Sequence, residues 1–166
     1  GLGDVYKSQT FNIVGKTLEG GVIVFGIAGH YISENIGSFL GPNLIGNIPD
    51  WKKIPGSFRN TFSGMKLLCC NSTDKELTVN FKGPALGVYV LAGPDAGVIE
   101  GSMDGGAWKS YDLYHRHSRG LHYPRTVMFA TDLKSSDHTA RIRMSEKSNK
   151  ASKGSSARIL QFTVNH

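Results

Sequence analysis

Residues 77–90, LTVNFKGPALGVYV, decide the fold class of this chain. Apolar residues occupy every second position from Leu77 to Phe81, and again from Leu86 to Val90 after a Lys-Gly-Pro break. Successive side chains of a strand point to opposite faces, so this spacing predicts two strands with one buried face each.

The same alternation recurs further along the chain. It predicts strands at Val98–Met103, 107–114, 125–130, 138–144 and 158–164. An Asp-Gly-Gly turn at 104–106 separates the first two of these segments and predicts a β-hairpin. In the last segment, the spacing places Leu160, Phe162 and Val164 on the buried face.

The first half of the chain is less regular. Segments 11–14, 22–27 and 65–70 read as strands, and the closely spaced glycines and prolines of 37–55 predict a long ordered loop with room for an edge strand. The pattern therefore predicts an all-β, antiparallel β-sandwich of about nine or ten strands. With 166 residues and no domain boundary in sight, a single domain over residues 1–166 is expected.

Composition is that of an ordinary globular domain, with 39% hydrophobic and 19% charged residues. The longest apolar run, 22–28, is too short for a membrane span, which needs about 20 residues. The chain starts at Gly1 rather than Met, and we expect an export signal to have been removed. The protein is then secreted, periplasmic or at the cell surface.

Cys69 and Cys70 are adjacent on a predicted strand and so point to opposite faces. A disulfide between them would strain the backbone, so we expect two thiols, one buried and one outward. Two neighbouring thiolates do not make a metal site by themselves.

The motifs of serine hydrolases are missing from the sequence. Neither Gly-x-Ser-x-Gly nor Gly-Asp-Ser occurs. Asp95 and Asp104 lie in predicted turns, and Glu100 and Asp112 lie on the predicted hairpin, where carboxylates usually face solvent. We therefore expect no catalytic residue in this chain and no cofactor.

The densest group of chemically versatile residues is 114–125, YHRHSRGLHYPR, with three histidines, three arginines, two tyrosines and no acid. His115 and His117 would share one face of a strand, but no cysteine or carboxylate lies nearby in sequence to complete a metal site. Two interpretations stay open: a polar surface loop, or a loop that binds a ligand or partner through arginine forks and aromatic faces.

A nucleic-acid partner is considered because the formal net charge is +6. The second basic stretch, 141–158, holds six Lys or Arg residues against one acid. Arg141 and Arg143, however, are the outward half of an alternating strand, and the lysines lie in a polar loop. Nucleic-acid binding is therefore not favoured.

Flat aromatic side chains can stack on sugar rings or pack in a core. The candidates for either role are Trp51, Tyr89, Trp108 and Tyr111. Combining this reading with the 114–125 cluster gives one predicted ligand-binding site near the Asp104 hairpin, formed by Trp108, Tyr114, His117, Arg119 and His122.

Three long stretches carry a family resemblance: TVNFKGPALGVYVLAGPDAGVIEGSMDGGAWKSYDLY, RHSRGLHYPRTVMFATDL and HTARIRMSEKSNKASKGSSARILQFTVN. From residue 77 onward the chain resembles the β-sandwich accessory domain of bacterial SGNH (GDSL-type) hydrolases, many of them carbohydrate esterases. The strand, Asp-Gly-Gly hairpin and HTARIRM order is also similar to the jelly-roll, galactose-binding-like domain of acetyl-xylan-type esterases.

The resemblance implies that the Ser-Asp-His machinery lies in a separate α/β domain. The chain would then be a non-catalytic accessory module that binds polysaccharide or docks on the catalytic SGNH-type domain. Two alternatives remain, a standalone cell-surface interaction domain and a hydrolase with an unrecognised site.

Overall fold

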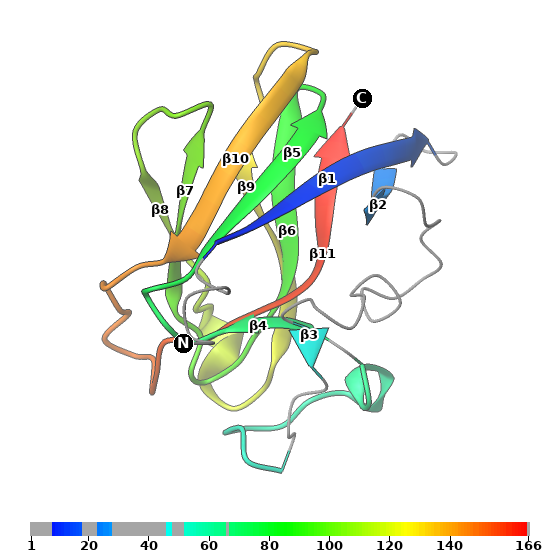
Figure 1. The fold of residues 1–166 in the computed structure, drawn as a ribbon. Coiled ribbons are helices and arrows are strands. Elements are labelled where there is room, and N and C mark those ends of the chain that lie inside the picture. The colour runs from blue at the N-terminus through cyan, green and yellow to red at the C-terminus, as the bar shows by residue number, and fades with distance from the viewer. Residues whose placement is uncertain (1–7, 18–22, 28–45, 48–51, 66, 166) are drawn as a thin grey trace, which may run out of the picture.

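The computed structural model describes residues 8–17, 23–27, 46–47, 52–65 and 67–165, and these form an all-β sandwich (Figure 1). The strands are β1 Ser8–Thr17, β2 Ile23–Ile27, β3 Gly46–Asn47, β4 Leu67–Cys70, β5 Glu76–Lys82, β6 Ala85–Ala92, β7 Val98–Met103, β8 Lys109–Asp112, β9 Tyr123–Ala130, β10 Asp137–Met144 and β11 Ala157–Asn165. Two short 3-10 helices are η2 Asn60–Phe62 and η3 Arg116–Arg119. The predicted fold class is confirmed, and no helix in the described ranges could cross a membrane.

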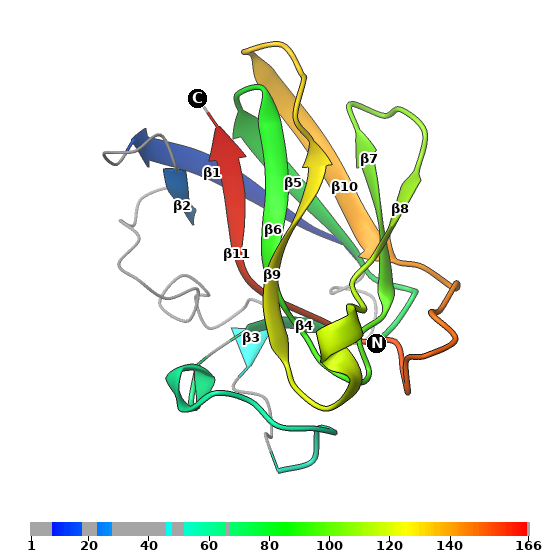
Figure 2. The ribbon, with the colours of Figure 1, turned by 180° about the vertical axis from the view of Figure 1, so that it is seen from behind.

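Two sheets face each other. Sheet A has the order β8-β7-β10-β5-β1. Sheet B has the order β9-β6-β11, and the edge of β11 opposite β6 pairs with β4 along its first residues and with β2 along its last (Figure 2). β1 belongs to both sheets, because residues 8–12 pair with β5 and residues 13–17 pair with β2. The β1–β5 pairing is parallel, whereas the other strand pairs of the described chain are antiparallel.

The core between the sheets consists of the side chains that the alternation placed inward. Val79 and Phe81 of β5 meet Val88 and Val90 of β6, and Ile142 of β10 packs in the same cluster. The Asp-Gly hairpin is also confirmed: it joins β7 to β8 through left-handed residues at positions 104 and 105, with φ of 51° and 74°.

One inward assignment is wrong. Leu160 packs on the outer face of sheet B, whereas Ile159 and Val164 lie in the core between the sheets. The pairing of β11 with β6 shifts register between Ile159 and Gln161. A bulge adds one residue to the strand and reverses the alternation there. Counting every second residue back from Val164 therefore assigns Leu160 to the wrong face.

The outer face of sheet B is covered by a third layer. Phe62 from η2 packs with Leu67, Leu91 and Leu160 in a second apolar cluster, against which Tyr89 and Cys69 also rest. Tyr89 is therefore a packing residue. Both cysteines are free thiols on opposite faces of β4, but neither is fully outward, because this layer covers the second face as well.

The covering segment is tied to the chain before β9. The Ser57 amide donates to the Gly120 carbonyl at 2.8 Å, and the His122 amide donates to the Ser57 carbonyl at 2.7 Å. Segments more than 60 residues apart in sequence are thus joined at one end of the sandwich. Most of the predicted loop 37–55, including Trp51, lies outside the described residues; its described part contains the edge strand β3, which pairs with β4.

Candidate functional site

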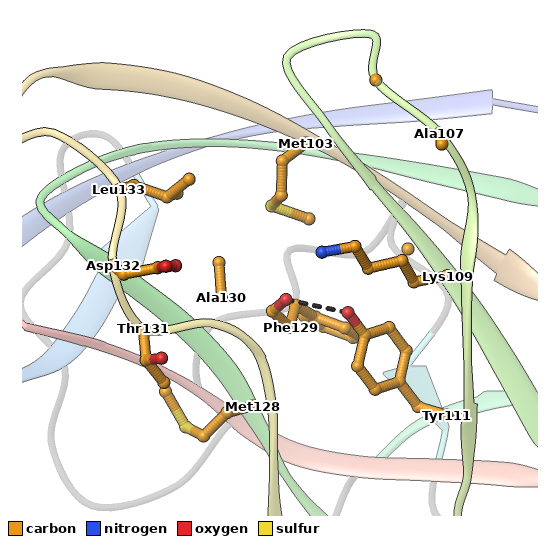
Figure 3. Close-up of a pocket in the computed structure, with 12 residues that line it drawn as sticks. Met103, Ala107, Lys109, Tyr111, Met128, Phe129, Ala130, Thr131, Asp132 and Leu133 are labelled. Carbon is orange, nitrogen blue, oxygen red and sulfur yellow. Dashed lines mark hydrogen bonds between the residues drawn. The ribbon is translucent and has the colours of Figure 1, made fainter.

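A cleft of about 380 Å³ lies between the edge strands β8 and β9, where the two sheets separate (Figure 3). Within the described ranges, β8 pairs with β7 and β9 pairs with β6, so each strand has an open edge beside the cleft. The residues after β9, Thr131 to Leu133, close one side. We call this hollow the β8–β9 cleft.

Tyr111 and Phe129 join the two strands along one wall of the cleft. The Tyr111 hydroxyl donates to the Phe129 carbonyl at 2.8 Å, and the two rings meet edge to face with centroids 5.0 Å apart. Gly101 makes room for this pair, because a Cβ there would lie 3.0 Å from the Phe129 ring. Burial raises the pKa of Tyr111, so its hydroxyl stays a hydrogen-bond donor at neutral pH.

Opposite charges enter the cleft from its two sides. Lys109 of β8 and Asp132 of the loop after β9 point toward one another, with Ala130 between them (Figure 3). Among the described residues, no ion pair joins these two charges. The amine and the carboxylate are therefore both available to a ligand, one as a donor and the other as an acceptor.

Two thioethers supply apolar surface. Met103 extends into the cleft from the end of β7, and Met128 lies on the β9 side (Figure 3). Met128 is 38% exposed, which is unusual for a large apolar side chain in this fold. Methionine is flexible and polarisable, so it adapts to ligands of irregular shape.

A serine, a histidine and a carboxylate meet beside the cleft, at the start of β10. His138 Nδ1 lies 2.7 Å from Asp104 Oδ2, and its Nε2 lies 3.2 Å from the Ser136 hydroxyl. However, Nε2 is closer still, at 2.8 Å, to the Lys134 carbonyl oxygen. A carbonyl only accepts, so Nε2 carries a proton and cannot take one from Ser136 in this arrangement.

The predicted ligand-binding loop is centred on η3. His115, His117 and Tyr123 form a cluster of three rings with centroids 4.9 to 5.1 Å apart, in which His115 stacks nearly parallel to Tyr123. Burial of its ring lowers the pKa of His115, and the positive charge of Arg125 lowers it further. The neutral imidazole that results favours ring stacking over ion pairing.

The five predicted site residues do not converge on one pocket. His117 and Arg119 are exposed on η3, whereas Tyr114 is half-buried and packs against the main core. Trp108 immediately precedes β8, whereas η3 follows it, so the strand separates Trp108 from η3 by about 13 Å. Trp108 lies on the outer face of sheet A. There the Arg143 guanidinium carbon is 4.1 Å from its ring centroid.

His122 lies inside the molecule, with 0% of its surface exposed. Its Nδ1 is 3.1 Å from the Ser57 carbonyl, and its ring lies against Gly93. His122 therefore supports the loop from beneath, while its neighbours on η3 reach solvent. No group of histidine, cysteine or carboxylate ligands suited to a metal ion occurs in the part of the chain that the structure describes.

The cleft residues were only partly visible in the sequence. Tyr111 was a stacking candidate, but Lys109, Met103 and Asp132 carried no motif. Lys109 and Tyr111 are two positions apart on a strand and so share the inward face, which was the one available signal. Asp132 could not be placed, because its approach to Lys109 depends on the loop between β9 and β10.

No protein-family model and no curated protein matches the sequence. Among solved structures, a two-domain esterase active on acetylated mannans is 13% identical, with a TM-score of 0.47 over 63% of this chain and 28% of that chain. An exo-β-1,3-galactanase from Phanerochaete chrysosporium is 20% identical, with a TM-score of 0.43 over 68% of this chain and 25% of that chain.

A family 35 carbohydrate-binding module from Clostridium thermocellum is 18% identical, with a TM-score of 0.43, and the match covers 75% of this chain and 88% of that module. The chain thus spans about a quarter of the length of the two enzymes it resembles. At these scores the function has to be inferred from the residues of the chain itself.

Proposed function

We propose that this chain is a non-catalytic carbohydrate-binding domain and that the β8–β9 cleft is its binding site. The observation that carries the proposal is the pair of opposed charges, Lys109 and Asp132, in a cleft of mixed polar and apolar lining. The volume of about 380 Å³ falls in the range of ligand pockets, about 300 to 1,000 Å³.

The mixed lining favours a polyhydroxylated ligand. Sugar hydroxyls both donate and accept hydrogen bonds, so they can satisfy the Lys109 ammonium and the Asp132 carboxylate at the same time. The C–H faces of a sugar can meanwhile lie on Met103 and Phe129. One positive and one negative charge sum to zero, which favours a neutral sugar over an acidic one.

The same residues do not support bond cleavage. Glycoside hydrolysis uses two carboxyl groups that flank the scissile bond, and Asp132 is the one carboxylate that lines the cleft in the described chain. Ester hydrolysis by a Ser-His-Asp triad needs an unprotonated imidazole nitrogen beside the serine, and His138 Nε2 faces the Lys134 carbonyl instead.

The sequence resemblance supports a finer proposal. The domain would be the accessory module of an exported SGNH-type carbohydrate esterase, whose catalytic domain lies elsewhere in the protein. The outward side chains of η3, His117 and Arg119, would then form the contact with that catalytic domain or with a second stretch of glycan. A standalone cell-surface interaction domain stays the alternative.

The test is affinity electrophoresis of the chain in gels that contain mannan, xylan, β-glucan or pectate. A neutral polysaccharide should retard the wild type, and Lys109→Met should weaken binding about tenfold or more, because a hydrogen bond to a charged group is lost. Lys147→Met is the matched control: Lys147 is an exposed lysine in the β10–β11 loop, and its substitution should leave retardation within about twofold.

Two outcomes would contradict the proposal. One is no retardation by any glycan. The other is equal loss in the Lys109 and Lys147 variants, which would indicate general charge attraction. Retention of a purified SGNH-type domain without any glycan binding would favour the docking role.

A further inference from the structure

His138 lies on β10 outside the β8–β9 cleft, in a separate hollow that it lines together with Phe81 and Asp104. Its side chain is 8% exposed, and its ring packs on Phe81 with centroids 5.4 Å apart. Each ring nitrogen faces an oxygen from a different loop. Nδ1 lies 2.7 Å from Asp104 of the β7–β8 turn, and Nε2 lies 2.8 Å from the Lys134 carbonyl of the β9–β10 loop.

Both contacts exist together only when the ring is an imidazolium. An ionised carboxylate and a carbonyl can only accept, so each nitrogen must carry a proton. The hydrogen bond to the Lys134 carbonyl and the bond to Asp104 raise the pKa of His138, against the opposing effect of burial. We call His138, Asp104 and Lys134 the His138 clamp.

The other charged groups around the ring do not alter this direction. Asp137, on β10 itself, adds a weaker pull that also raises the pKa of His138. Lys82 of β5 pairs in register with Asp137, and the Lys134 side chain is exposed. The Thr139 amide and His138 hold the pKa of Asp104 below its ordinary value, so its carboxylate stays charged in mildly acidic solution.

The clamp binds the two walls of the cleft to one residue. Met103 and Leu133, which line the cleft, immediately precede Asp104 and Lys134 in the chain. Asp104 is further fixed by its second oxygen, which accepts from the Thr139 amide at 2.9 Å. Loss of a hydrogen bond at His138 would therefore free a residue that is directly bonded to a cleft-lining residue, Met103 on one side or Leu133 on the other.

We propose that His138 is the positioning residue of the β8–β9 cleft and that its protonation holds the cleft in its ligand-binding shape. The inference rests on the proposed function, because it assigns regulation to the same site. A neutral ring has one N–H and must release either Asp104 or Lys134. Binding is then strongest below the pKa of His138 and weakens as the pH rises through it.

The first experiment measures glycan affinity from about pH 5.5 to about pH 9. The wild type should lose about tenfold in affinity as His138 deprotonates. His138→Phe keeps the ring on Phe81 but has no donor, so its affinity should be low and independent of pH. Asp104→Asn should also flatten the profile, because the asparagine amide can donate to Nδ1 of a neutral ring or accept from Nδ1–H of a charged ring. Asparagine also tolerates the left-handed turn conformation of residue 104.

Asp137→Asn is the matched control. It removes a carboxylate that makes no hydrogen bond to the ring but weakly raises the pKa of His138, so the pH profile should keep its amplitude and move only slightly to lower pH. An unchanged profile in His138→Phe, or an equal effect of both aspartate substitutions, would overturn the proposal.

A second readout does not depend on any ligand. NMR titration of the His138 ring should give a pKa above the ordinary value of about 6.5. The protection factors of the amides at residues 131–136, which correct amide exchange for its intrinsic rise with pH, should fall as the ring deprotonates. Failure of every glycan to bind would contradict the proposed function. Protection factors that stay constant through the titration would overturn the clamp even if the cleft binds sugar.

Discussion

Arg158 and Asp95 form a bidentate ion pair within the fold, with Nη1–Oδ1 at 2.8 Å and Nη2–Oδ2 at 2.6 Å. Arg158 of β11 is 5% exposed, and Asp95 lies in the turn between β6 and β7. The pair closes one end of sheet B beside Cys69. It also explains why a charged residue is accommodated in the covered face of β11.

Removal of one partner of this pair should strongly destabilise the domain. Arg158→Met is expected to lower the free energy of unfolding by about 3 to 5 kcal/mol, because Asp95 is left buried and unpaired. Urea denaturation measures the change. Arg141→Met breaks the exposed pair with Glu76, which solvent screens, so it should cost far less stability than Arg158→Met. Equal losses in the two variants would contradict the assigned burial.

The same pair predicts acid sensitivity. Burial opposes the ionisation of Asp95, but the hydrogen bonds and charge of Arg158 outweigh it and lower the pKa of that carboxyl. Its stabilisation is therefore complete above the unfolded value of about 3.9 and is lost as the pH falls through the lower folded value. Urea unfolding between about pH 2 and pH 6 should have a shallower pH slope in Arg158→Met than in the wild type.

Gly93 should not tolerate a side chain. A Cβ there would lie 2.3 Å from Nε2 of His122, whose ring is fixed by Ser57 and fully buried. Gly93→Ala should destabilise by about 1 to 3 kcal/mol. Gly120→Ala is the control, since nothing lies within 4 Å and its φ is −135°; it should change stability by less than about 0.5 kcal/mol. Thermal unfolding of both variants measures the loss of stability, and equal melting temperatures would contradict the prediction.

The Cys69 thiol should be chemically inert in the folded domain. Burial raises its pKa to about 11, although the Arg158 charge opposes the shift. At pH 8 only about one thiol in a thousand is then ionised, so iodoacetamide should label Cys69 very slowly until urea unfolds the chain. Mass spectrometry of the labelled peptide measures the rate. Rapid labelling under native conditions would disprove the burial.

The isolated chain should not hydrolyse nitrophenyl acetate in a saturable way. Ser136 lies 3.2 Å from His138, but that nitrogen is held by the Lys134 carbonyl. Ser136→Ala should leave the background rate unchanged at about pH 6, where the protonated His138 ring donates to the Lys134 carbonyl. Saturable turnover that disappears in this variant would establish the hydrolase alternative.

The amino-acid sequence by itself determined the strands and the faces they bury. Alternation depends only on neighbours two positions apart, so Leu77–Phe81 and Ala140–Met144 were oriented correctly without knowledge of their partners. The same local rule failed at Leu160, because a bulge is defined by the partner strand. Alternation also does not predict that η2 covers the outer face of sheet B, because that contact joins segments distant in sequence.

The candidate site was decided by the tertiary structure. Lys109 lies on β8 of sheet A and Asp132 lies in the loop after β9 of sheet B, and the His138 clamp joins a turn at Asp104 to a carbonyl at Lys134. Lys109 and Asp132 lie 23 residues apart in sequence, and Asp104 and His138 lie 34 residues apart. Asp104 and His138 meet because β10 pairs with β7. Such distances follow from long-range pairing, which no local pattern encodes.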